Sequence, residues 1–195
     1  MTVEASPAPS YPMRLDVAYP EQLARFGPVY KWLLAIPHFI ILYVLSSLIS
    51  VVTFIAFFAI LFTKRYPKGL FDIMVGVYRW QANVGAYIGL MRDEYPPFSW
   101  DAGRYPVEFS VEYPEELSRW LIFVKWLLTI PHFIVLIVLW IVALFAWMVA
   151  WVVIIFTRKY PRGIFDFLVG VMRWGMRVTV YYNLMRDEYP PFSLK

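Results

Sequence analysis

Apolar residues in this chain gather into two long blocks, and these blocks predict its main elements. The first block runs from Tyr30 to Thr63 and the second from Val124 to Thr157, and each holds one lysine near its start and no other charged side chain. A proline inside each block is expected to begin or kink a helix. The helix that follows would be about 40 Å long, which is enough to cross the hydrocarbon core of a bilayer. The pattern therefore predicts membrane spans at 37–63 and 131–157.

A short alternating pattern precedes each block. Apolar residues occupy every second position, and this period of two is typical of a half-buried strand. The alternating apolar residues are Met13, Leu15 and Val17 in the first copy and Val107, Phe109 and Val111 in the second. Between strand and block, a proline followed by acidic residues predicts the start of an amphipathic lead-in helix. We expect its Arg25 and Lys31 to lie among lipid headgroups.

A second helix is predicted after each block, at 69–91 and 163–185. Its polar residues recur at spacings of four, three and four, so they form one narrow polar stripe on an otherwise apolar helix. The stripe consists of Asp72, Gly76, Arg79 and Asn83 in the first copy and Asp166, Gly170, Arg173 and Arg177 in the second. One interpretation is a proton or anion path within the membrane. The favoured one is structural, either a charge clasp between the copies that joins Asp72 to Arg173 and Asp166 to Arg79 or a contact with lipid phosphate.

These patterns recur because the chain is a tandem duplication with a constant offset of 94 residues. Residues 90–99 and 184–193 are identical, and matches extend from Tyr11 onward. We assign repeat 1 to residues 11–101 and repeat 2 to 105–195, with residues 1–10 as a disordered tail. The predicted fold is an all-α membrane protein of two repeats. Each repeat has a short strand, an amphipathic lead-in, a long transmembrane helix and a second membrane-embedded helix.

Whether the second helix of each repeat crosses the membrane is the open question of topology. A central arginine costs about 2.5–3.5 kcal/mol in a spanning helix, and an in-plane interfacial helix avoids that cost. Crossing would bring both basic turns to one side of the membrane and both strands to the other, where the strands could pair. We favour crossing, and hence four membrane helices, with the interfacial arrangement as the alternative.

Composition and charge support a membrane location. The chain is 61% hydrophobic and 16% charged and has no cysteine, which excludes disulfides and thiolate metal sites. Its net charge of +4 comes from cations beside apolar segments, which favours lipid phosphate over nucleic acid as a partner. The predicted headgroup-binding residues are Lys64, Arg65, Lys68, Arg158, Lys159 and Arg162.

The two histidines, His38 and His132, occupy equivalent positions just after a proline. Two imidazoles at one depth could ligate a haem iron or a pigment magnesium. The favoured interpretation is structural, with each ring bonded to a carbonyl that the proline leaves free. The sequence contains no nucleotide fingerprint, nucleophile–base pair or metal-ligand cluster, so we predict no enzyme activity, no metal and no cofactor.

The recurring Tyr-Pro, Ile-Pro-His-Phe-Ile, Tyr-Pro-x-Gly-x-Phe-Asp, Gly-x-x-Arg-Trp and Tyr-Pro-Pro-Phe-Ser motifs resemble a bacterial family of integral-membrane proteins. That family is known only as a domain of unknown function. The resemblance covers both copies, from Tyr11 to Ser193. It implies a membrane protein with paired repeats, and it brings no activity, ligand or catalytic residue.

The sequence leads to one favoured function and two rivals. The favoured function is a non-catalytic accessory or scaffold subunit of a larger membrane complex, including one of the energy-transducing kind. The first rival is a small transporter or lipid-binding protein that uses the interface between the repeats, and the second is a haem or pigment carrier. We expect a multi-pass protein of the bacterial plasma membrane, with lipids and other membrane subunits as partners and homo-oligomerisation left open.

Overall fold

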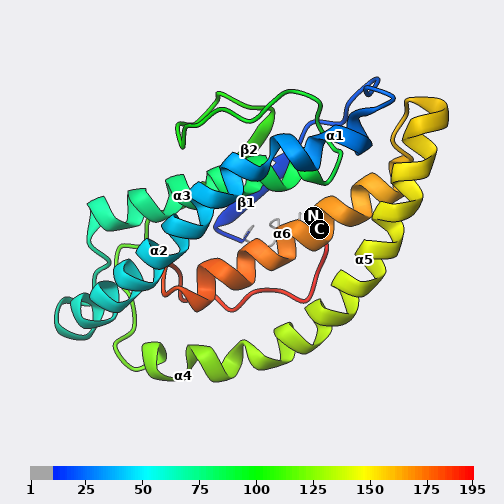
Figure 1. Ribbon diagram of the computed structural model, residues 1–195. Helices are drawn as coiled ribbons and strands as arrows, with labels where there is room; N and C mark the ends of the chain where they lie inside the picture. The colour runs from blue at the N-terminus through cyan, green and yellow to red at the C-terminus, as the bar shows by residue number, and fades with distance from the viewer. Residues whose placement is uncertain (1–10) are drawn as a thin grey trace, which may run out of the picture.

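The computed structural model describes residues 11–195, and the predicted tail at 1–10 lies outside them (Figure 1). Each repeat contributes one strand and three helices in the same order. Repeat 1 contains β1 (Met13–Val17), α1 (Gly27–Leu34), α2 (Ile36–Thr63) and α3 (Lys68–Ile88). Repeat 2 contains β2 (Val107–Val111), α4 (Leu121–Leu128), α5 (Ile130–Thr157) and α6 (Arg162–Tyr182).

The helices α2, α3, α5 and α6 begin and end within one turn of the bounds predicted from the sequence, whereas the lead-in helices begin later than predicted, at Gly27 rather than Pro20 and at Leu121 rather than Pro114. Pro37 lies in the first turn of α2, so the proline begins a new helix rather than kinking a continuous one. The long helices end at a left-handed residue, Lys64 after α2 and Arg158 after α5. The extended residue Pro67 then precedes α3, and Pro161 precedes α6. Local sequence therefore determines where these four helices start and stop.

The two predicted strands are confirmed, and they pair with each other. β1 and β2 form a two-stranded antiparallel sheet in which Leu15 lies opposite Phe109. Those two residues are equivalent in the repeats, being 94 positions apart. A local two-fold axis therefore passes between them. The apolar side chains of β1 are buried and the intervening Arg14 and Asp16 are exposed, as the alternation predicts.

The repeats exchange their strands. α3 of repeat 1 packs against β2, and α6 of repeat 2 packs against β1. Within each repeat the long helix packs against the second helix, α2 on α3 and α5 on α6. Figure 1 shows α3 running beside α2 and partly behind it, and α5 bending around the outside of α6. The hydrophobic core thus extends through both repeats.

Two segments of the described chain are long and apolar enough to cross a membrane, Ile36–Thr63 and Leu121–Thr157. The four membrane helices predicted from the sequence therefore reduce to two candidates. α3 and α6 are not among the helices that are long and apolar enough to cross, and both are packed into the core over most of their length.

The predicted separation of turns from strands is wrong. The Leu117 N–H donates to the Lys64 carbonyl at 2.8 Å, and the Tyr113 hydroxyl donates to the Tyr66 carbonyl. The basic turn after α2 therefore touches the segment that leaves β2. Repeat 2 has the same arrangement, in which the Leu23 N–H donates to the turn after α5 at 2.9 Å. A bilayer cannot lie between segments that are hydrogen-bonded to each other.

Candidate functional site: an apolar cavity between the repeats

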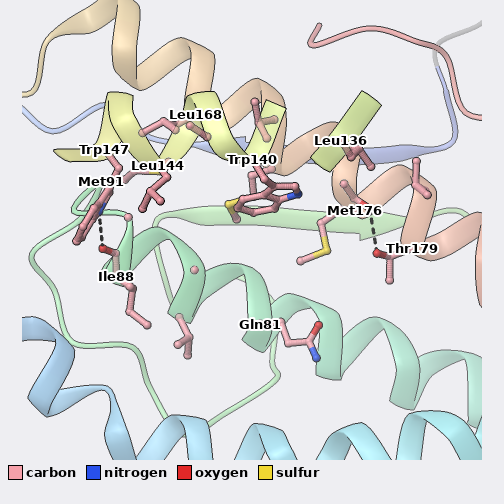
Figure 2. A pocket seen from close by; sticks show the side chains of 18 of the residues that line it. Gln81, Ile88, Met91, Leu136, Trp140, Leu144, Trp147, Leu168, Met176 and Thr179 are labelled. Carbon is pink, nitrogen blue, oxygen red and sulfur yellow. Dashed lines mark hydrogen bonds between the residues drawn. The ribbon is translucent and has the colours of Figure 1, made fainter. Parts of the chain in front are cut away.

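A cavity of about 930 Å³ lies between α3, α5 and α6, next to the first turns of α2 (Figure 2), and it is open on one side, where Trp140 and Leu144 are more than half exposed. Its walls are almost entirely aliphatic, aromatic and methionine side chains, with Gln81 and Thr179 as the polar exceptions. The Thr179 hydroxyl donates to the Gly175 carbonyl at 2.9 Å, so that donor is already used inside α6. Gln81 extends from α3 among the apolar side chains in Figure 2. It is the main polar group left for a bound molecule.

Both repeats contribute equivalent residues to this cavity. Val84 of α3 and Val178 of α6 are 94 residues apart, as are Phe39 of α2 and Phe133 of α5, and all four line it. The cavity therefore lies at the interface of the two repeats. Such interfaces between packed helices are common places for small-molecule sites.

The two repeats differ in the size of the side chains at equivalent positions around the cavity. Trp140 of α5 lines it, whereas the equivalent residue of α2 is Ser46. Trp147 also lines it, and its indole N–H donates to the Ile88 carbonyl at the end of α3 at 3.2 Å. The residue equivalent to Trp147 is Thr53. Repeat 2 thus supplies the aromatic wall, so the internal symmetry is broken where a ligand would be recognised.

Two glycines leave space in the walls. A Cβ built on Gly175 would lie 3.9 Å from Trp140, and one on Gly85 would lie 3.8 Å from Met172, both ordinary van der Waals contacts. Larger side chains at these positions would extend into the cavity without displacing the backbone. A site with these walls offers apolar contact and one amide, and no nucleophile or general base. Its chemistry is binding rather than catalysis.

The predicted ligand residues His38 and His132 lie outside this cavity, each in an aromatic cage of its own repeat. The Trp80 indole N–H donates to His38 Nδ1 at 3.1 Å, and the imidazole stacks on Phe98 with ring centroids 4.2 Å apart. The partner is thus a tryptophan rather than the predicted carbonyl. No ring contact joins the two histidines in the described chain, and both Nε2 atoms are buried without a hydrogen-bond partner there. Ligation of one metal by both rings gains no support from this arrangement.

His132 has the same surroundings as His38. The Trp174 indole N–H donates to its Nδ1 at 3.0 Å, and the ring stacks on Phe192 at 4.0 Å. Because Nδ1 accepts a hydrogen bond in both cages, the ring hydrogen lies on Nε2. Among residues 11–195 no group of three or more side chains is placed to hold a metal ion.

The polar stripe does not form the predicted clasp between Asp72 and Arg173 or between Asp166 and Arg79. Asp72 pairs instead with Lys68 at 2.6 Å, and Asp166 with Arg162 at 3.2 Å, each one turn away on its own helix. The carboxylates are more than half exposed. The arginines Arg79 and Arg173 have other partners, on the strands.

Two of the stripe arginines, Arg79 and Arg173, each bind an outer edge of the sheet. Arg79 donates to the Phe109 carbonyl at 3.2 Å and to the Trp100 carbonyl at 2.7 Å. Arg173 donates to the Leu15 carbonyl at 2.8 Å and pairs with Asp16 at 2.7 Å. The stripe is therefore a structural seam against the strands. A proton or anion path along it would have to compete for donors that are already used.

The last pair of the stripe, Asn83 and Arg177, is also buried. Arg177 donates to the carbonyls of Ser193 and Lys195 near the end of the chain. The Asn83 side-chain oxygen is buried and has no hydrogen-bond partner among the described residues. Neither residue lines the cavity.

A protein-family model matches both repeats, over residues 28–99 and 119–193. The chain belongs to the DUF4389 family, described as a domain of unknown function. This confirms the resemblance inferred from the motifs and the duplication. No curated protein and no solved structure matches the chain.

Each DUF4389 repeat also holds a buried lysine that the sequence interpretation misplaced. Lys31 was expected among lipid headgroups, but it is 2% exposed and pairs with Asp93 at 2.7 Å. It also donates to the Arg92 carbonyl at 2.7 Å. Burial lowers the pKa of Lys31, and the hydrogen bond to Asp93 opposes that shift. Lys125 has the same contacts in repeat 2, with Asp187 at 2.8 Å.

A signal for this pair was present in the sequence. A single lysine at the same place in both apolar blocks requires a partner, and the Arg-Asp-Glu that follows the second helix in both copies supplies acids that recur with it. Asp93 also accepts a hydrogen bond from the Ala24 N–H at 2.6 Å. The pair thus joins the lead-in of a DUF4389 repeat to the end of that repeat's last helix.

The predicted headgroup residues lie at the turns after the long helices, and all six are exposed. Lys68 and Arg162 are engaged by Asp72 and Asp166. Lys64 lies 3.9 Å from Glu116, a distance at which an exposed pair contributes little. Arg65, Arg158 and Lys159 form no ion pair within residues 11–195. Headgroup binding by these residues of the DUF4389 chain stays a prediction.

Proposed function

We propose that this DUF4389 protein binds the apolar chain of a lipid in the cavity between its repeats. The observation that carries the proposal is the cavity itself, about 930 Å³ in volume and walled by apolar residues from both repeats. Burial of hydrocarbon against such walls contributes roughly 25 cal/mol per Å². Gln81 would orient a polar group at one end of the chain. The protein would act in the bacterial plasma membrane, where such molecules are abundant.

Filling the cavity should abolish lipid retention. In Gly175→Leu and Gly85→Leu the new side chains project into the space without a backbone clash. We expect wild-type protein, reconstituted in nanodiscs of phosphatidylethanolamine and phosphatidylglycerol, to keep one lipid per chain in native mass spectrometry. The retained fraction should fall at least tenfold in either variant, at collision energies that strip loosely bound lipid.

Gly69→Leu and Gly163→Leu are the matched controls. Both glycines lie in the first turn of a helix, and a Cβ there would meet nothing within 4 Å. Glycine-to-leucine changes in a helix favour folding by roughly 1 kcal/mol, so all four variants should remain folded. Lipid retention that is unchanged by filling the cavity, or that is lost equally in the controls, would contradict the proposal.

The accessory or scaffold function inferred from the sequence stays a prediction. Purification in a gentle detergent from the native membrane tests it, because a subunit should bring stoichiometric partners and a self-sufficient lipid binder should not. Homo-oligomerisation is read from the same preparation by its mass.

A further inference from the structure

Both ends of α2 are bound to one continuous segment of the chain. At its start, the Tyr95 hydroxyl donates to the Leu34 carbonyl at 3.1 Å, just before α2. At its end, the Leu117 N–H donates to the Lys64 carbonyl at 2.8 Å. Residues 95–117 therefore run from one end of α2 to the other, a distance of about 42 Å for a helix of this length.

That segment requires water along its course. β2 lies within it, and residues 101–104, which precede the strand, are all exposed. Its exposed charged residues are Asp101, Arg104, Glu108, Glu112, Glu115 and Glu116. If α2 stood upright across a bilayer, residues between its two ends would lie at the level of the hydrocarbon, where charged side chains are strongly disfavoured.

Both ends of α5 are also hydrogen-bonded to the rest of the chain, here by two separate segments. The Tyr189 hydroxyl donates to the Leu128 carbonyl at 3.1 Å, next to the start of α5. At the other end, the Leu23 N–H donates to the Arg158 carbonyl at 2.9 Å. The two long helices are thus both fixed to the strand-bearing layer, by which we mean β1, β2 and the segments that flank them.

The outer faces of α2 and α5 have the opposite character. Val44, Phe54 and Phe62 are 64%, 66% and 72% exposed on α2, and Phe156 is 76% exposed on α5. Exposed large apolar residues recur along both helices, which is unusual on the surface of a soluble protein. The exposed cations Arg65 and Lys159 lie just beyond the ends of the two helices, where they match lipid phosphate.

We infer that the protein inserts into a single leaflet of the membrane without crossing it. α2 and α5 lie along the membrane plane with their outer faces among the acyl chains, and the strand-bearing layer stays in water on the same side. This replaces the multi-pass arrangement expected from hydropathy. Length and composition suit α2 and α5 for spanning, but the hydrogen bonds at their ends hold them flat.

Spin labels along α2 measure its inclination directly. The chain has no cysteine, so Val44→Cys, Val51→Cys and Phe58→Cys each give one label on an exposed position. Their spacing of seven residues keeps them near one face of the helix and separates neighbours by about 10 Å along its axis. In vesicles of phosphatidylethanolamine and phosphatidylglycerol, we expect equal depths from oxygen and nickel-chelate relaxation. A Val51 label deeper than both others by about 10 Å would overturn the inference.

Sidedness gives a second, independent readout. Lys68→Cys lies in the turn after α2 and Glu94→Cys beyond the end of α3, and both side chains are more than half exposed. A membrane-impermeant maleimide should label both from the same side of sealed vesicles. Labelling from opposite sides would refute insertion in one leaflet. Only variants that retain the wild-type melting temperature are compared. Neither the depth of the labels nor their sidedness depends on whether the cavity holds a lipid.

Discussion

At the residue scale, the two buried lysines are the most constrained charges of the molecule. Each is enclosed by its own repeat and meets one carboxylate and one backbone carbonyl. Lys31 also lies over the Tyr87 ring, with its nitrogen 5.2 Å from the centroid. A buried ammonium with these partners is satisfied, whereas one without them retains the full cost of desolvation.

Removing the carboxylate of the pair should therefore lower the free energy of unfolding more than removing the lysine ammonium does. Asp93→Asn leaves Lys31 buried without a counterion, and we expect it to lower the free energy of unfolding by about 3 kcal/mol. Lys31→Met should cost less, because Asp93 is 31% exposed and keeps its hydrogen bond from Ala24. Denaturant unfolding in detergent micelles measures both. Glu116→Gln is the control, since its exposed pair with Lys64 should contribute under about 1 kcal/mol. Equal losses in Asp93→Asn and Glu116→Gln would contradict this account.

At the scale of elements, the sequence predicts the helices and strands well and their partners poorly. Periodicity and proline are local signals, so β1, β2 and the helices α2, α3, α5 and α6 follow from them. The partner of Arg79 is not local: the same spacing suits an acid on the other helix or a carbonyl on a strand edge. The partner is decided by the packing of the repeats, in which each stripe lies against the strand of the other repeat.

The cavity could be anticipated only in outline. Its location between the repeats was among the sequence interpretations, and the exchange of Ser46 for Trp140 is visible on alignment of the two copies. Its volume depends on how far four helices stand apart, which no local pattern encodes. The number of crossings was predicted from hydropathy, which measures how well a helix suits lipid and not the direction in which it lies, and the structure retains two candidate spans.

The stripe arginines should stabilise the sheet specifically. A two-stranded sheet is marginal alone, and Arg79 and Arg173 bind carbonyls on its two outer edges. Hydrogen bonds from charged donors contribute roughly 1.5–3 kcal/mol, so Arg79→Met or Arg173→Met should speed amide exchange in both strands about tenfold or more. Hydrogen–deuterium exchange with mass spectrometry resolves this. Arg104→Met removes only an exposed pair with Asp101 and should leave the strands unchanged. Strand exchange that is the same in all three variants would count against the edge role.

At the scale of the whole molecule, the two repeats depend on each other. The sheet takes one strand from each, and each second helix packs against the strand of the other repeat. The start of each lead-in is also hydrogen-bonded to the turn of the other repeat. Duplication has therefore produced one cooperative unit rather than two linked domains.

Two separately encoded halves, residues 1–101 and 102–195, should fold only together. Either half alone exposes an unpaired strand and loses the helix–strand contacts across the axis, so we expect it to aggregate or be degraded. Co-expressed, the halves should co-purify at a ratio of one to one and melt as a single transition. The control is the same pair with Leu15→Asp, because Leu15 is fully buried at the axis and a carboxylate there should prevent pairing. A lone half that is stable and melts like the whole chain would show that the repeats are independent, and the exchange of strands would then contribute little to stability.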